Sequence, residues 1–262
     1  MATQKSSMPG TYPLHGLSEE KMSAIRAELA PTGTLRVALN LANFLLINAQ
    51  RDADGTPTGI APDIGRELAR RLAVPVTFVP YAQPGELAAA VSDGVWDVGL
   101  IGADPLRAGE IAFTPAYLEI EATYLVLADS PIQFLEEVDR PGIRIAVADK
   151  SAYDMYLRRT LKHATLHRAE GLEGSYQLFL QEKLDVLAGL KPRLIADQAK
   201  HPGSRVLAGR FTSIQQAIGT PIARTASAAY LKTFGEDIKA GLVAQLIARH
   251  GVRGVTVAPF SA

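Results

Sequence analysis

Short apolar runs of strand length alternate with segments of helical periodicity in the first part of this chain. The runs 35–39, 76–79 and 96–101 have the length and composition of buried strands. Between them, apolar residues recur at helical spacing in 63–72 and 86–91. Strands that alternate with helices build a mostly parallel sheet that is covered on both faces. The alternation therefore predicts an α/β fold.

A second series of the same kind begins after Gly142. The run 143–148 predicts a strand, 149–152 a tight turn and 153–161 a helix. Farther along the chain, an apolar helix face is formed by Tyr176, Phe179, Leu180 and Leu184. Such an aromatic stripe is far more often core than binding site.

The segment between the two series is extended and alternating at 117–126, which predicts a long strand. Ser130 follows as an N-cap, with Pro131 at the first helical position and Gln133 as a capping-box residue, so a helix is expected there. Short strands are expected at 206–207 and 216–218.

Both ends of the chain have helical patterns. Ser18 is a suitable N-cap for a helix at 19–29, whose Met22, Ile25 and Leu29 share one face. We interpret residues 1–33 as an extension that is packed on the main body. At the other end, apolar residues recur at helical spacing through 225–250.

Composition excludes several classes of protein. Lys+Arg and Asp+Glu are equal at 27 each, without the basic excess of a nucleic-acid binder. The absence of cysteine removes disulfides, thiolate chemistry and zinc–cysteine sites. No apolar run reaches the length of a membrane span, and the 5 histidines have no metal-ligand spacing. We therefore expect a globular protein without a metal or cofactor.

Polar and charged residues follow two of the predicted strands. Asn40, Asn43 and Phe44 come after the first strand, whereas Gly102, Asp104 and Arg107 come after the third. Ligands of open α/β sheets sit beyond the carboxyl ends of the strands, so both groups should face one crevice. There the Arg107 guanidinium would offer a planar fork of donors to a carboxylate. The alternative interpretation makes Arg107 an ordinary surface arginine.

The stretch 96–117 resembles the ligand-binding segment of the family 3 extracellular solute-binding proteins, the amino-acid receptors of ABC importers. In that family the pattern D-(A/V)-x-(I/L)-x-(G/S)-x-(T/S)-x-x-x-x-R-x-x-x-I-x-F-(T/S)-x-x-Y carries the arginine that grips the ligand's α-carboxylate. The matching residues here are Asp97, Arg107, Ile111, Phe113, Thr114 and Tyr117.

The resemblance extends from about Thr34 to about Val252. The turn at 149–152 resembles the family's V-x-x-G-(S/T)-(S/T) turn, in which a helix N-terminus presents N–H groups to the same carboxylate. Ser151 and Ala152 match this pattern, and Lys150 replaces the usual glycine. Ser151 as a plain N-cap is the alternative, and the two roles are compatible. The segment 184–189 resembles the family's (V/L)-D-A strand.

The resemblance implies a two-lobed fold of the type II periplasmic-binding-protein kind, each lobe a mostly parallel sheet flanked by helices. Residues 34–119 and 214–262 would form lobe 1, and 120–213 would form lobe 2. The lobes would close on a small carboxylate-bearing ligand by hinge motion, and a membrane ABC permease would read the closed form. The expected location is the periplasm. Because 1–16 lack the apolar core of a signal peptide, either the signal was removed or the protein is cytoplasmic.

The chain departs from the family where the ligand's ammonium group is held. Two acids do this in the ordinary amino-acid receptors, and their positions are occupied here by Asn40 and Leu190. In one alternative the ligand lacks a cationic amine and is bound by the amides of Asn40 and Asn43 with Phe44 stacked against it. In the other, an acid on the crossing strand holds the ammonium group of the ligand. We favour the second, with Glu121 before Glu119; because the two alternate along a strand, at most one is expected to face the cleft.

An enzyme of the same architecture is the main alternative, since periplasmic cyclohexadienyl dehydratases use this fold for an acid-catalysed elimination. Glu119, Glu121 and Asp104 are the candidate acids by position. The sequence contains no independent nucleophile–base pair or phosphate loop, so we expect binding without turnover. A third class is an intracellular effector-binding domain, but the residues before the first strand are too few for a complete helix-turn-helix.

Overall fold

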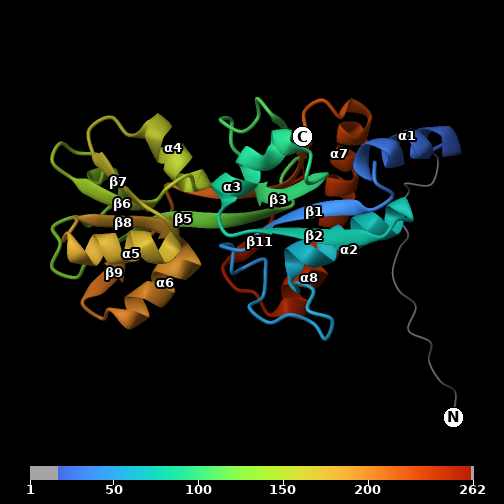
Figure 1. Ribbon diagram of the computed structural model, residues 1–262. Coiled ribbons are helices and arrows are strands. Elements are labelled where there is room, and N and C mark those ends of the chain that lie inside the picture. The colour runs from blue at the N-terminus through green and yellow to red at the C-terminus, as the bar shows by residue number, and fades with distance from the viewer. Residues whose placement is uncertain (1–16, 261–262) are drawn as a thin grey trace, which may run out of the picture.

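The computed structural model describes residues 17–260 as two lobes joined by two long strands (Figure 1). All strands belong to one curled sheet in the order β2-β1-β3-β10-β5-β8-β6-β7, with β4, β9 and β11 paired at its sides. The strands are β1 (Leu35–Asn40), β2 (Val76–Tyr81), β3 (Val98–Gly102), β4 (Ile111–Phe113), β5 (Leu118–Leu127), β6 (Arg144–Ala148), β7 (Thr165–Ala169), β8 (Val186–Leu190), β9 (Ser204–Val206), β10 (Thr212–Pro221) and β11 (Val255–Val257).

The helices cover this sheet on both faces. They are α1 (Glu19–Leu29), α2 (Ile60–Leu72), α3 (Pro84–Ala89), α4 (Ala152–Thr160), α5 (Gly171–Gln181), α6 (Lys191–Lys200), α7 (Thr225–Lys239) and α8 (Leu242–His250), with the 3-10 helices η1 (Ala90–Asp93) and η2 (Leu135–Glu137). The predicted α/β fold is confirmed.

Lobe 1 is built on the parallel strands β2, β1 and β3. Leu35, Val37 and Leu39 of β1 are buried in the main core cluster with α2, whereas Ala38 faces the opposite side and packs in a second cluster with Leu87 of α3. Because side chains alternate along a strand, burial on both sides explains why the strand is apolar almost throughout.

Lobe 2 repeats this arrangement with the parallel strands β8, β6 and β7. Ile145 and Val147 of β6 lie in the main cluster, whereas Ala146 packs on the other face with Tyr176 and Phe179 of α5. The prediction that this aromatic stripe belongs to the core is confirmed.

The strands β5 and β10 run antiparallel to each other and cross between the lobes (Figure 1). Near its start β5 pairs with β11 of lobe 1, and from Ala122 onward it pairs with β8 and β9 of lobe 2. The change of partners makes this segment the place where the lobes meet. The division at 119/120 and 213/214 stays a prediction.

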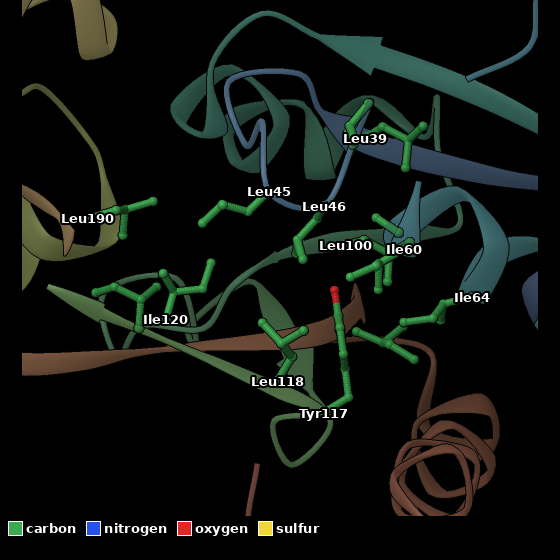
Figure 2. Close-up of a cluster of buried hydrophobic side chains, with 14 of the residues drawn as sticks. Leu39, Leu45, Leu46, Ile60, Ile64, Leu100, Tyr117, Leu118, Ile120 and Leu190 are labelled. Atoms are coloured by element: carbon green, nitrogen blue, oxygen red, sulfur yellow. The ribbon is translucent and has the colours of Figure 1, made fainter. Parts of the chain in front are cut away.

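The main core cluster continues from one lobe to the other. Figure 2 shows Leu118 and Ile120 of β5 beside Leu190 of β8 and Leu45 of the loop that follows β1. Tyr117 is fully buried in the same cluster, and its hydroxyl has no hydrogen-bond partner among the described residues.

Helix α1 forms as predicted, with the Ser18 hydroxyl accepting a hydrogen bond from Lys21 N. Its buried Ile25 and Leu29 pack on the main body, where α1 contacts α7. Residues 1–16 of the predicted extension lie outside the described residues.

The prediction of a helix directly after Ser130 is wrong. Ser130 Oγ accepts from Ile132 N in a turn, and the short η2 helix begins only at Leu135. The Glu137 carboxylate caps η2 by accepting from the N–H groups of Gln133 and Phe134. The N-cap and capping-box residue types were therefore present, but they serve a turn.

The C-terminal helical pattern is interrupted at Ala240 and Gly241, which separate α7 from α8. The elements that the sequence left unassigned are β4, β7, β11 and α6. Within residues 17–260, no helix combines the length and apolarity that crossing a membrane requires.

Candidate functional site

A cleft opens where the carboxyl ends of the lobe 1 strands meet lobe 2. It is lined by Asn40, Ala42, Asn43, Gln83, Pro84, Gly102, Arg107, Ala148, Asp149, Ser151, Ala152, Tyr153, Leu172, Leu190, Ile214 and Gln216. The predicted site residues Asn40, Asn43, Gly102, Arg107, Ser151 and Ala152 come together here. This is the crevice expected beyond the strand ends of an open α/β sheet.

Arg107 lies in the turn after β3 and is buried, with 7% of its surface exposed. One guanidinium nitrogen donates to Gly102 O at 2.7 Å and another to Lys150 O at 2.9 Å. Burial lowers the pKa of this guanidinium to about 10, against a smaller raising effect of Asp104. Arg107 is thus charged at neutral pH, and among the described residues no carboxylate forms an ion pair with it.

The N-terminus of α4 faces Arg107 from lobe 2. The Ser151 hydroxyl caps the helix by accepting from Asp154 N, and Ser151 N donates to Ala148 O. The next two N–H groups, of Ala152 and Tyr153, lie in the first helical turn, where no intrahelical acceptor exists. Because both residues line the cleft, a positively polarised helix end and a buried guanidinium meet there.

Lys150, which stands where the resembling family has glycine, has a φ of +56°. This left-handed conformation favours glycine, which gives a physical reason for the family pattern. Lys150 is predicted as a cleft residue, but its backbone carbonyl, and not its ammonium, reaches the site by accepting from Arg107. Its side chain lines an adjoining outer pocket with Arg168 and Glu170.

Two amide side chains form the polar floor of the cleft on lobe 1. Asn43 and Gln216 are 6% and 4% exposed, and Asn43 Nδ2 donates to Gln216 Oε1 at 3.4 Å. Asn40 and Gln83 also line the cleft with amide side chains, and Asn40 uses its Oδ1 to accept from Ala42 N.

The two lobes touch across the cleft. Arg159 of α4 forms a 2.7 Å ion pair with Asp104, whose side chain is buried. Gly102 lies so close to lobe 2 that a Cβ there would be 3.2 Å from that of Ala152. The structure is therefore a closed arrangement. Asp104 is predicted as a ligand-binding residue, but it is absent from the cleft lining and forms this interlobe ion pair instead.

Glu121, which is predicted to face the ligand, lies on the face of β5 that points away from the cleft. Residues two apart point to the same face of a strand, so the expectation that at most one of the two glutamates faces the cleft used the strand period wrongly: Glu119 and Glu121 lie together, on the face opposite to that of Ile120. Ile120 pairs with Ile214, which lines the cleft, and the two glutamates are on the other face. Figure 2 shows Ile120 on the side of β5 that faces Leu45 and Leu190.

Both glutamates have other partners on that face. Glu121 pairs with Lys191 at 2.8 Å and Arg210 at 3.4 Å, and the hydrogen bond from Lys191 lowers the pKa of its carboxyl. Glu119 accepts from Gln215 Nε2 at 2.8 Å. Phe44 is also absent from the cleft lining and is 43% exposed.

Sequence reasoning missed several residues of the cleft, notably Gln83, Tyr153 and Gln216. Gln83 follows the carboxyl end of β2, so the rule that selected Asn40 would have found it. Gln216 lies within β10, where only the pairing with β3 and β5 reveals which residues face the ligand. Asp149 is the one carboxylate among the lining residues, and no group of acidic and histidine residues in 17–260 could hold a metal ion.

The family model of the bacterial extracellular solute-binding proteins, family 3, matches residues 41–249, which is most of the chain. The residues of the cleft all fall inside this match except Asn40.

Solved structures share the fold. A mutant of the arginine-binding protein ArgBP from T. maritima has a TM-score of 0.68 at 21% identity, covering 86% of this chain and 98% of that one. A putative ABC transporter binding component from Wolinella succinogenes, complexed with lysine, has a TM-score of 0.67 at 20% identity, with 83% and 95% covered. An ancestral amino-acid-binding protein, a precursor of cyclohexadienyl dehydratase, has a TM-score of 0.66 at 22% identity, with 85% and 97% covered. These likenesses show the two-lobed fold.

Proposed function

Because the chain belongs to the family 3 bacterial extracellular solute-binding proteins, we propose that it captures a small carboxylate-bearing ligand between its lobes and delivers it to a membrane ABC permease. The observation that carries this proposal is the Arg107 guanidinium. It is buried at the cleft, it is charged at neutral pH, and within residues 17–260 it has two carbonyl partners and no ion pair with a carboxylate. A buried charge without an ion-pair partner is costly, and a ligand carboxylate would offset that cost.

The N-terminus of α4 supports the same assignment from the other lobe. A carboxylate on Arg107 would also meet the free N–H groups of Ala152 and Tyr153. Such a ligand contacts both lobes at one end, so it favours the closed arrangement by its extra contacts there. The permease would then distinguish the closed form from the open one.

Amino acids and their close relatives are the ligand class that we propose. The structural neighbours include an arginine-binding protein and a protein complexed with lysine. Glu121, which we expected to hold the amine, is on the wrong face of β5, so the amine end of the ligand needs a different account. By its family the protein acts outside the cytoplasm, and we propose the periplasm as its location.

An elimination reaction on the same scaffold is the second candidate, favoured by the likeness to the precursor of cyclohexadienyl dehydratase. It requires an acid that faces the ligand. Asp104 is paired with Arg159, and Glu119 and Glu121 lie on the far face of β5, which leaves Asp149 at the cleft rim. We propose binding without turnover. NMR of the ligand incubated with stoichiometric protein tests this, and conversion that disappears in Asp149→Asn would establish the enzyme instead.

The test of the binding proposal starts with native mass spectrometry of the purified protein to identify the co-purifying ligand, followed by calorimetric titration of the ligand-stripped protein. Arg107→Ala should lower the affinity at least a hundredfold, because the ligand carboxylate would stay buried without its partner. Arg140→Ala is the matched control, since Arg140 is an exposed arginine of lobe 2 that pairs with Glu137. Retained affinity in Arg107→Ala would refute the proposal.

A further inference from the structure

We infer that the side chains of Gln83 and Lys150 restrict the cleft to acids with a short side chain. The two side chains cross between the lobes in opposite directions and separate the cleft from the outer pocket. This inference rests on the proposed function, because it concerns the length of the ligand that Arg107 holds.

Each of these side chains lies on a glycine of the other lobe. The Lys150 side chain of lobe 2 lies on Gly85 of α3, where a Cβ would be 2.9 Å from Lys150 Cβ and 3.0 Å from its Cδ. The Gln83 side chain of lobe 1 lies on Gly171 of α5, where a Cβ would be 2.9 Å from Gln83 Nε2. Only glycine admits so close an approach. The two contacts therefore form a reciprocal pair between the lobes.

The spaces on the two sides of these contacts differ greatly in size. The cleft that contains Arg107 has a volume of about 50 Å³, whereas the outer pocket has about 500 Å³. One water molecule needs about 10–15 Å³ of such space, so the cleft holds about four groups of that size, a carboxylate and little more. Gln83 and Asp149 line both spaces and thus form the wall between them. A long ligand would have to pass this wall.

The backbone of Lys150 indicates that its side chain has a role. Among the described residues other than glycine, a left-handed φ occurs at Ala73, Lys150 and Lys183. Ala73 and Lys183 lie at the C-terminal ends of α2 and α5, where this conformation is ordinary. Lys150 instead precedes α4, and a strained residue that no helix end explains is typical of a functional site. Glycine would serve this backbone better, so the difference that lysine makes is its side chain.

The stem of Lys150, rather than its charge, closes the cleft. The atoms that lie on Gly85 are Cβ, Cγ and Cδ, and the ammonium group has no ion-pair partner in the part of the chain that the structure describes. The outer pocket itself is polar, since it is also lined by Glu86, Asp149, Arg168 and Glu170. Removal of the stem would therefore open the cleft to a long ligand with a polar end.

The experiment measures how affinity depends on the length of an uncharged side chain. One series consists of glycine, L-alanine, L-glutamine and L-citrulline, and an amine-free series consists of acetate, propanoate and hexanoate. Each acid is titrated calorimetrically into the ligand-stripped protein. In the series that binds, the longest acid should bind the wild type at least about tenfold more weakly than the best short one. Tighter binding of the longest acid would overturn the inference and leave the role of Arg107 intact.

The variants are compared by the ratio of the affinities for the longest and the best short acid, because loss of an interlobe contact weakens closure on every ligand. Lys150→Gly removes the stem, suits the left-handed backbone and should keep or raise the melting temperature. It should raise the ratio at least about tenfold, and so should Gln83→Ala. Lys150→Met keeps the stem without the charge and should leave the ratio unchanged. Lys183→Gly, the matched control, relieves a left-handed lysine outside the cleft lining and should also leave it unchanged.

The outcomes distinguish this inference from the proposed function. An unchanged ratio in Lys150→Gly or in Gln83→Ala, with binding that still requires Arg107, would overturn the inference alone. An equal rise in Lys150→Met would assign the selection to the charge of Lys150 and would overturn it as well. Absence of binding by every acid of both series would overturn the proposed function and this inference together.

Discussion

Each lobe contains an aspartate–arginine pair that joins two of its strands. The aspartate is buried in lobe 1 and partly exposed in lobe 2. In lobe 1, Asp97 precedes β3 and accepts from the backbone N–H and Nε of Arg36 on β1, both at 2.9 Å. In lobe 2, Asp185 precedes β8 and accepts from the N–H and Nε of Arg144 on β6, at 2.8 and 3.1 Å. Each aspartate therefore ties the third strand of its lobe to the first.

The difference lies in burial and in partners. The Asp97 side chain is fully buried and also binds Arg224, just before α7, at 2.8 Å. The Asp185 side chain is 36% exposed and pairs with Arg144 alone. Asp97 of lobe 1 thus has a second ion-pair partner, Arg224, which comes from the C-terminal part of the chain.

The same contrast appears in the cleft. Lobe 1 contributes the buried polar side chains of Arg107, Asn43 and Gln216. Lobe 2 contributes the start of α4, with the N–H groups of Ala152 and Tyr153, and the side chain of Asp149. A side chain recognises a ligand only if its conformation is fixed, whereas a helix N-terminus binds an anion through backbone N–H groups that the helix already holds in place. We therefore regard lobe 1 as the recognising lobe and lobe 2 as the lobe that closes on it.

The largest predicted effect on stability separates the two aspartates. Asp97→Asn should lower the free energy of unfolding by about 3–5 kcal/mol, since it leaves two arginines beside a buried neutral group. Asp185→Asn, the matched control, should cost about 1 kcal/mol or less because its ion pair is partly exposed. Urea unfolding followed by circular dichroism measures both. Similar losses would mean that the lobes are fixed equally.

The second prediction concerns the stability that the folded protein loses because the charged Arg107 guanidinium is buried. Burial lowers its pKa from the ordinary arginine value to about 10, which corresponds to a penalty of roughly 3 kcal/mol on the charged form. Arg107→Met should therefore raise the melting temperature of the ligand-free protein while it removes ligand binding. Differential scanning calorimetry tests this, and a lower melting temperature would show that Arg107 is structural.

The sign of the pH dependence follows from the same pKa. The folded pKa lies below the unfolded one, so above about pH 10 the unfolded chain binds more protons than the folded one and the penalty is progressively relieved. Below pH 10 the penalty is fully present. The stability difference between wild type and Arg107→Met should consequently be constant from pH 6 to about pH 9.

The third prediction tests the contact between the lobes. Asp104→Asn keeps the shape of the side chain and an oxygen for Leu106 N, but it removes the charge that Arg159 meets. The ratio of closed to open protein should fall about tenfold, equivalent to 1.4 kcal/mol. Small-angle scattering of the ligand-free protein should show a larger radius of gyration. An unchanged radius would show that this ion pair does not hold the lobes closed.

The smallest effect on ligand affinity is expected at the N-terminus of α4, where lobe 2 would bind the ligand through backbone N–H groups. Ser151→Ala removes an N-cap, which costs about 1 kcal/mol of stability, but it leaves the N–H groups of Ala152 and Tyr153 in place. Affinity should fall less than fivefold, against a hundredfold for Arg107→Ala. Ser18→Ala, which removes the cap of α1, is the control for stability alone. A hundredfold loss in Ser151→Ala would mean that lobe 2 also reads the ligand with a side chain.

The fold was largely predictable because its elements have strong local patterns. The runs at β3 and β8 are apolar throughout and those at β1 and β6 almost so, and Ser18 and Ser151 cap the helices that they precede. The helix expected after Ser130 failed for a tertiary reason, since the Arg205 guanidinium binds the backbone carbonyls of Ser130 and Ile132. Local capping chemistry cannot reveal a partner 75 residues away.

The candidate site was predictable only in part. Arg107 and Asn43 follow strand ends, so one topological rule places both in the cleft. The expectation for Glu121 differs from the structure for another reason. Side chains alternate along a strand, so Glu119 and Glu121 lie on the same face of β5. Only the pairing of β5 with β10 shows that this face points away from the cleft. Likewise, the sequence gives no indication that Asp104 is paired with Arg159.

A crystal structure of the protein with its co-purified or identified ligand tests the central claim most directly. The account predicts that the carboxylate oxygens of the ligand lie about 3 Å from the Arg107 guanidinium and from the backbone nitrogens of Ala152 and Tyr153. A carboxylate bound elsewhere, for example at Lys150 and Arg168 in the outer pocket, with Arg107 still bound only to Gly102 O and Lys150 O, would contradict it.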